Sequence, residues 1–167
     1  MKKQYKIFIV EDNHFFSGCV GQYLKLKGYA VQSFYKGEEM LLHLDENPDI
    51  IILDYYLDEK DKHAVMNGKE VLAELKKNNV KVPVVMLSVE EDVELVIKLL
   101  KNGACDYVLK DDNVFANIEK AVSAVVQVLD LKNQIDDSRG NIVKGVKRIM
   151  VYTVLILSMI LTYKYFS

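Results

Sequence analysis

The sequence predicts a doubly wound α/β domain with a five-stranded parallel sheet, followed by a C-terminal hydrophobic helix. Short apolar runs alternate with segments of helical period along most of the 167 residues. Three of the runs are almost continuously apolar, as expected for parallel strands that are covered on both faces. This order of strand and helix signals is typical of a parallel sheet with crossover helices.

The expected strands are five short runs bounded by polar or turn residues. They are YKIFIV at 5–10, YAVQSF at 29–34, DIIILD at 49–54, VPVVMLS at 82–88 and CDYVLK at 105–110. The second run alternates polar and apolar residues more than the others do. We therefore expect it at an edge of the sheet.

Helices are expected between the strands, where apolar residues recur at helical spacing. These segments are 16–24, 40–44, 71–75, 93–100 and 114–129, and we expect the last to continue to Ile135. Gly28 and Gly103 follow the first and fourth segments, where glycine commonly ends a helix. The sequence thus predicts one domain over residues 1–135.

Charge is unevenly distributed along the chain. The whole chain has 22 basic and 24 acidic residues, but from position 139 onward it has five basic residues and no acidic one. Residues 1–138 therefore contain 17 basic and 24 acidic side chains, a formal charge of −7. An acidic body argues against direct DNA binding, because phosphate neutralisation dominates such binding.

Two scattered cysteines, Cys19 and Cys105, have no metal-ligand spacing and are typical of reduced thiols in a cytoplasmic domain. The apolar run 7–10 is too short for the core of a signal peptide. Both observations predict a cytoplasmic domain.

The C-terminal region predicts a basic linker at 136–148 and a hydrophobic helix at 149–166. Residues 149–163 carry no charge, and the 18 positions of the helix correspond to about 27 Å. That length is near the lower limit for spanning a bilayer. Because Lys144, Lys147 and Arg148 precede it, we expect a membrane anchor that tethers the domain to the cytoplasmic face. Burial by self-association or against the domain is the alternative.

Polar residues stand where the predicted strands end. Carboxylates follow the first strand and end the third, and a serine and a lysine end the fourth and fifth: these are Glu11, Asp12, Asp54, Ser88 and Lys110. The carboxyl ends of parallel strands form the ligand-binding edge of such a sheet. Clustered carboxylates favour Mg²⁺, and a carboxylate can itself attack phosphorus. Asp54, in the central position, is the candidate nucleophile.

Four motifs together resemble the receiver domain of two-component response regulators. They are IFIVEDN, IIILDYYL, VVMLSVEED and GACDYVLK, and the resemblance covers roughly residues 4–130. It implies a flavodoxin-like fold and a chain that is not a conventional enzyme. It also implies transfer of a phosphoryl group to Asp54 from a histidine kinase or phosphotransfer protein, with Mg²⁺.

Roles for individual residues follow from the same resemblance. The metal would be held by Glu11, Asp12, Asp54 and the backbone carbonyl of Tyr56. Ser88 and Lys110 would contact the phosphoryl oxygens, and Tyr107 would move with Ser88 on activation. Tyr56 and Glu90 would tune the lifetime of the phosphoryl group. The resemblance further implies an unidentified downstream protein partner and leaves a homodimer open.

Three departures from the family pattern leave an alternative open. Val89 is bulkier than the small residue usual after Ser88, and a long polar loop occupies 58–67. Asp111 follows Lys110 where a proline is common, so a cis peptide bond is not expected there. The alternative is an interaction module that uses the same fold without phosphate. A phosphatase ranks lower, because Tyr56 stands where its second carboxylate would be.

Overall fold

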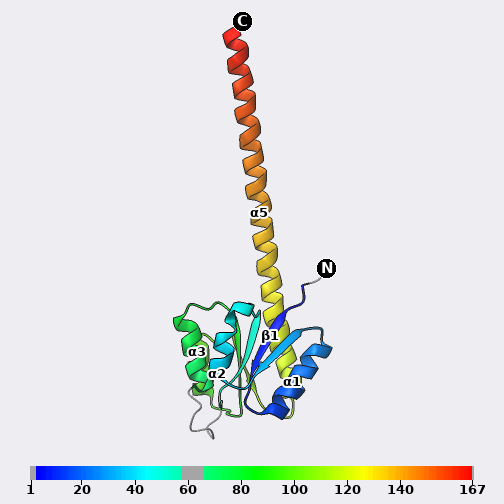
Figure 1. The fold of residues 1–167 in the computed structure, drawn as a ribbon, viewed down its shortest axis with the longest axis vertical. Coiled ribbons are helices and arrows are strands. Elements are labelled where there is room, and N and C mark those ends of the chain that lie inside the picture. The colour runs from blue at the N-terminus through cyan, green and yellow to red at the C-terminus, as the bar shows by residue number, and fades with distance from the viewer. Residues whose placement is uncertain (1–2, 58–65, 167) are drawn as a thin grey trace. The chain divides into compact units, whose positions relative to one another are not determined.

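The computed structural model describes residues 3–57 and 66–166, with the side chains as far as Thr153 (Figure 1). The chain divides into two compact units, Met1–Val126 and Gln127–Ser167. The first unit contains the whole sheet. The predicted loop at 58–67 lies mostly outside the described residues, which resume at Met66.

Five parallel strands form one sheet in the order β2-β1-β3-β4-β5. They are β1 (Lys6–Val10), β2 (Ala30–Phe34), β3 (Ile50–Asp54), β4 (Val84–Ser88) and β5 (Asp106–Leu109). Every predicted strand is confirmed, and β2 lies at an edge as expected. The order is the doubly wound arrangement in which ligands bind at the carboxyl edge, near the crevice between β1 and β3.

The helices are α1 (His14–Leu26), α2 (Gly37–Leu42), α3 (Gly68–Lys77), α4 (Val93–Lys101) and α5 (Val114–Phe166), with a short 3-10 helix η1 (Leu44–Glu46) after α2. Side chains cap α1 and α3: Asn13 accepts from the Phe16 amide, and Asn67 forms a capping box with Glu70. Gly28 and Gly103 have positive φ, as their predicted role in ending helices requires.

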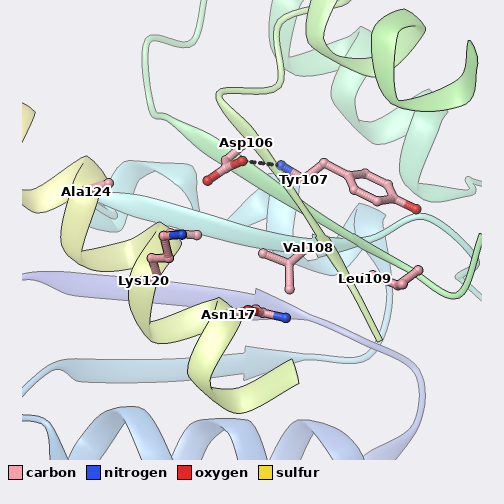
Figure 2. A pocket seen from close by; sticks show the side chains of 8 residues that line it. Asp106, Tyr107, Val108, Leu109, Asn117, Lys120 and Ala124 are labelled. Carbon is pink, nitrogen blue, oxygen red and sulfur yellow. Dashed lines mark hydrogen bonds between the residues drawn. The ribbon is translucent and has the colours of Figure 1, made fainter. Parts of the chain in front are cut away.

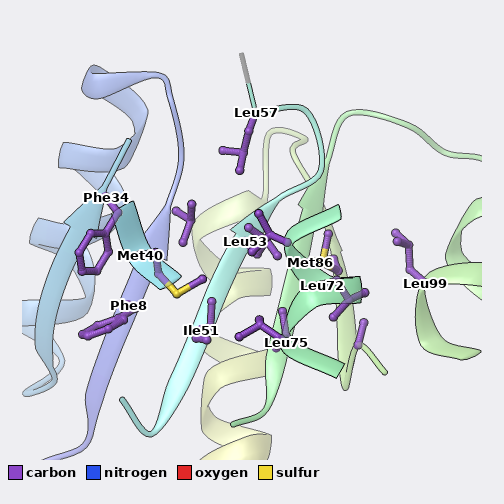
Figure 3. Close-up of a cluster of buried hydrophobic side chains, with 14 residues drawn as sticks. Phe8, Phe34, Met40, Ile51, Leu53, Leu57, Leu72, Leu75, Met86 and Leu99 are labelled. Carbon is purple, nitrogen blue, oxygen red and sulfur yellow. The ribbon is translucent and has the colours of Figure 1, made fainter. Parts of the chain in front are cut away.

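The sheet buries a different apolar cluster on each face, because neighbouring side chains of a strand point to opposite sides. Figure 3 shows the cluster that joins β1, β3 and β4 to α2, α3 and α4, including Phe8, Ile51, Leu72 and Met86. Helices α1 and α5 contribute fully buried residues to the core as well: Val20, Leu24, Ile118 and Val122. Cores on both faces hold the strand ends firmly in place.

The predicted linker at 136–148 is helical and belongs to α5, which is continuous from Val114 to Phe166. The segment has no proline, and each of its two glycines costs a helix only about 1 kcal/mol. Residues 149–166 are helical, as expected. The division into domain, linker and anchor at 1–135, 136–148 and 149–166 stays a prediction.

Among the described residues, no helix combines the length and the low charge that crossing a membrane requires. The predicted anchor at 149–166 lies largely outside this description, which includes no side chains from 154 onward.

Candidate functional site

The polar residues predicted from the strand ends meet at the carboxyl edge of the sheet. Asp54 ends β3 and Ser88 ends β4, while Glu11 follows β1 and Lys110 follows β5. Glu11, Asp54 and Ser88 are 1%, 3% and 0% exposed. Side chains this polar are rarely so buried without partners, which marks the edge as a candidate site.

Lys110 is the partner of both buried carboxylates. Its ammonium nitrogen lies 2.7 Å from an oxygen of Glu11 and 2.8 Å from an oxygen of Asp54. One cation therefore faces two carboxylates in a region with little water. A buried carboxylate without such a partner would destabilise the fold strongly.

The electrostatic balance of this group is incomplete. The pKa of Glu11 is raised to about 7, chiefly by burial and then by the charge of Asp54, while Lys110 opposes the shift. Burial also raises the pKa of Asp54, against the opposing effect of Lys110. Burial acts to lower the pKa of Lys110, but the two carboxylates raise it overall. The site thus carries more negative charge than one lysine neutralises, which favours an additional cation.

Three carboxylates could hold that cation. Glu11, Asp12 and Asp54 each offer an oxygen, and these oxygens lie within 4.8 Å of one another. Hard oxygen donors fit Mg²⁺, which commonly binds one or two carboxylates of such a group and keeps water for its remaining positions. The Tyr56 amide donates to Asp54 at 3.3 Å. Its carbonyl as a further ligand stays a prediction.

A hydrogen-bonded group around Glu90 lies next to Ser88. The Glu90 amide donates to the Ser88 hydroxyl oxygen at 3.1 Å, and the Tyr107 hydroxyl donates to the Glu90 backbone carbonyl. The Tyr56 hydroxyl donates to the Glu90 carboxylate at 2.8 Å. All the residues that the sequence singled out therefore lie at one edge of the sheet, where Glu90 connects both tyrosines to Ser88.

Comparison with protein families agrees with this geometry. The model of the response regulator receiver domain matches residues 7–123. The chain is a response regulator receiver. The match covers most of the sheet-containing unit and includes every residue of the site.

Curated relatives share this receiver. The probable C4-dicarboxylate response regulator DctR of Bacillus subtilis is 34% identical over 112 residues, which are 65% of this chain and 47% of that protein. The two-component response regulator ORR27 of Oryza sativa subsp. japonica is 36% identical over 105 residues, or 62% of this chain and 16% of that protein. The chain thus spans less than half the length of these relatives.

Among solved structures, the receiver domain of the Francisella response regulator 1452 has the same fold. Its TM-score is 0.66 at 22% identity, and the match covers 75% of this chain and 99% of that one. At this identity the likeness concerns the fold alone.

One residue that positions the receiver site was missed at the sequence level. Gly68 begins α3 and donates its amide to the Tyr55 carbonyl at 3.1 Å. An added Cβ would overlap the carbonyl oxygen of Asp54 and lie 2.9 Å from the Cα of Tyr55. Only glycine lets α3 approach the end of β3 this closely. The apolar spacing that predicts the helix at 71–75 contains no signal of this contact.

Two of the three departures from the family pattern lie among the described residues. Val89 is 63% exposed, so most of its side chain faces solvent. The part of the chain that the structure describes contains no cis peptide bond, as Asp111 after Lys110 led us to expect.

A pocket of about 250 Å³ lies between β5 and α5 of the receiver (Figure 2). Asp106 and Val108 line it together with Asn117 and Lys120 of α5. The Tyr107 ring points away from these α5 residues in Figure 2 and packs against the core of the opposite face. Strand β5 therefore has Tyr107 on one face and residues that line the pocket on the other.

Proposed function

We propose that the chain is a signalling receiver that accepts a phosphoryl group on Asp54, with Mg²⁺, and then changes its binding to a downstream protein. The donor would be a histidine kinase or a phosphotransfer protein. The observation that carries this proposal is the position of Asp54. Its carboxylate is buried, lies 2.8 Å from the Lys110 ammonium, and shares a possible metal site with Glu11 and Asp12.

The proposed reaction transfers the phosphoryl group from a phosphohistidine. A carboxylate oxygen of Asp54 attacks phosphorus, a P–O bond forms, and the P–N bond breaks as the imidazole leaves with its electron pair. Catalysis of such transfer rests on positioning and charge neutralisation. Lys110 holds the Asp54 carboxylate in place and neutralises charge beside it. When bound, Mg²⁺ would supply further positive charge to the phosphoryl oxygens.

Glu90 provides the proposed connection between phosphorylation and the surface. For Ser88 to contact a phosphoryl oxygen, its hydroxyl would turn from the Glu90 amide toward Asp54. Because the Tyr107 hydroxyl bonds the backbone of the same Glu90, that turn would disturb the tyrosine as well. The surface around α4 and β5 would change, and a partner could distinguish the two states. Tyr56, bonded to the Glu90 carboxylate, would affect the lifetime of the acyl phosphate.

This proposal makes the chain a participant in its own phosphorylation and dephosphorylation, without turnover of a separate metabolite. The phosphate-independent interaction module is the second candidate. It is favoured by one observation, the pairing of Lys110 with both buried carboxylates, which offsets their charge without phosphate.

A cytoplasmic location with a membrane tether is the further part of the proposal. It is supported by the uncharged run at 149–163 and by the basic residues before it. Cell fractionation of the full chain beside a chain ending at residue 148 tests the tether. Loss of the membrane fraction on truncation supports it, and equal distribution of both chains contradicts it.

Incorporation of a phosphoryl group into the full chain tests the receiver chemistry. Labelled acyl phosphate or a promiscuous histidine kinase serves as donor, with Mg²⁺ or with EDTA. We expect label that requires Mg²⁺ and is abolished in Asp54→Asn. Asp106→Asn changes a carboxylate of β5 outside this group and should keep the label. A folded protein that binds no Mg²⁺ and takes label from neither donor would favour the phosphate-independent module.

A further inference from the structure

The C-terminal unit contains a line of apolar residues along one side of α5, which we call the heptad stripe. It consists of Val128, Leu131, Ile135, Ile142, Ile149 and Tyr152. Their spacings of 3, 4, 7, 7 and 3 follow a seven-residue repeat over about three and a half heptads. Each of the six side chains is between 52% and 65% exposed. The receiver chemistry does not use this stripe.

Such a stripe needs a covering partner. Exposed apolar side chains in a contiguous arrangement mark interaction surfaces in soluble proteins. A helix in water also derives most of its stability from packing of an apolar face rather than from its intrinsic propensity. Between 127 and 153, all described side chains except Leu129 and Asp130 are exposed. Among the described residues of the C-terminal unit, this part of α5 therefore buries little apolar surface.

The period of the stripe points to another helix of the same kind. Apolar residues that repeat every 3.5 positions keep one side of a helix facing a partner helix in a left-handed supercoil. A second copy of this chain carries the same repeat and can serve as that partner.

The residue types at the heptad positions favour a parallel coiled coil of two helices. In heptad notation, the a positions hold β-branched Val128, Ile135, Ile142 and Ile149, and a d position holds Leu131. β-Branched residues at a with leucine at d favour parallel dimers over trimers and tetramers. The d positions Ser138 and Gly145 hold small residues, so the middle of the contact would bury less apolar surface.

The charges beside the stripe agree with a parallel arrangement. The flanking g and e positions hold Gln127 and Lys132, then Gln134 and Arg139. A parallel dimer places each g residue near the e residue of the following heptad in the partner. These pairs would join an amide to a cation, without repulsion between like charges. The aspartates at 130, 136 and 137 occupy outer b and c positions.

We propose that the chain forms a parallel homodimer through a two-stranded coiled coil of residues 127–153, about 40 Å long. This association does not require phosphorylation, and it deepens the proposed function by bringing two receivers onto one assembly. A downstream protein would then meet two sites per assembly, with the increase in avidity that linked sites provide.

Two neighbouring substitutions test the proposal in the full chain. Ile142 lies on the stripe and Val143 beside it, and both are exposed β-branched residues, at 65% and 53%. Sedimentation velocity in a mild non-ionic detergent measures the mass of the unphosphorylated protein. We expect the wild type and Val143→Glu to have about twice the chain mass of 19.2 kDa. Ile142→Glu should sediment as a monomer, with an unchanged circular dichroism signal from the receiver.

Disulfide trapping tests the orientation and does not depend on a charged substitution. Cys19 and Cys105 are replaced by serine, and single cysteines are introduced as Ile135→Cys, Ile142→Cys or Val143→Cys. A parallel dimer in register should link both stripe variants to themselves, and Val143→Cys far less. An antiparallel pair can bring at most one of these positions to its own copy.

Several results would overturn the proposal. A monomeric wild-type chain would do so, including one that binds anionic lipid vesicles through the stripe while remaining monomeric. A dimer that persists unchanged in Ile142→Glu would place the contact elsewhere. Equal disruption by Val143→Glu would show that the stripe is not the contact surface.

Discussion

Glu11 and Asp54 are almost completely buried at the edge of the sheet, whereas Val128 and Ile142 on the C-terminal part of α5 are more than half exposed. In each region, the side chains occupy the environment that costs free energy for their type. Within the receiver, Lys110 compensates for part of the buried charge. Along α5, no described neighbour compensates for the exposed apolar surface. The first mismatch supports the proposed metal and phosphoryl chemistry at Asp54, and the second supports the proposed pairing of two α5 helices.

Removing the positive charge of Lys110 should have the largest effect on stability. In Lys110→Met, two buried carboxylates lose their shared partner, so we expect the free energy of unfolding to fall by about 3–5 kcal/mol at pH 8 in EDTA. Urea denaturation measures this change. Lys147→Met removes an exposed lysine from the C-terminal helix and should change stability by less than about 0.5 kcal/mol. A similar small loss for both variants would mean that Lys110 does not compensate for the buried charge.

Adding one methyl group to a glycine should have opposite effects in the two regions. In Gly68→Ala, the new Cβ would overlap the Asp54 carbonyl, and the backbone must shift. We expect a loss of about 3 kcal/mol and weaker Mg²⁺ binding. Gly140→Ala has no atom within 4 Å of the new Cβ and should stabilise the helix by up to about 1 kcal/mol.

Thermal and urea unfolding measure both glycine variants, and isothermal calorimetry follows Mg²⁺ binding. Unchanged stability and metal affinity in Gly68→Ala would show that α3 can move away from Asp54 at little cost, contrary to the close contact described above.

The smallest expected effect is a pH dependence of the free energy of unfolding that arises at the buried site, from Glu11. Burial raises the pKa of Glu11 from 4.5 in the unfolded chain to about 7 in the fold, so the folded state binds more protons between these values. The stabilisation from the proton on Glu11 is therefore present below pH 4.5 and is lost as the pH rises through 7. In EDTA, the wild type should lose on the order of 2 kcal/mol relative to Glu11→Gln between pH 5 and pH 8.

Parallel urea titrations of the wild type and Glu11→Gln at several pH values check this prediction. A constant difference between the two proteins across the range would mean that Glu11 stays charged throughout.

Much of the fold could be predicted because its signals are local. The continuous apolar run at 50–53 indicates a strand covered on both faces, and Asp54 at its end indicates a site, before any contact is known. The positions of Glu11, Ser88 and Lys110 follow in the same way, because parallel strands align their carboxyl ends. The edge position of β2 followed from the alternation in its sequence.

Other features depend on contacts between distant residues or on helix continuity, and no local pattern contains them. Lys110 lies 99 positions from Glu11, and the register of the sheet brings its ammonium group to two carboxylates at once. The need for glycine at 68 arises only when α3 packs against the end of β3. The segment 136–148 has weak apolar periodicity when considered alone, yet it continues a helix already nucleated in the receiver. Propagating an existing helix costs little, whereas starting one is costly, so a segment with a weak helical signal of its own can continue α5.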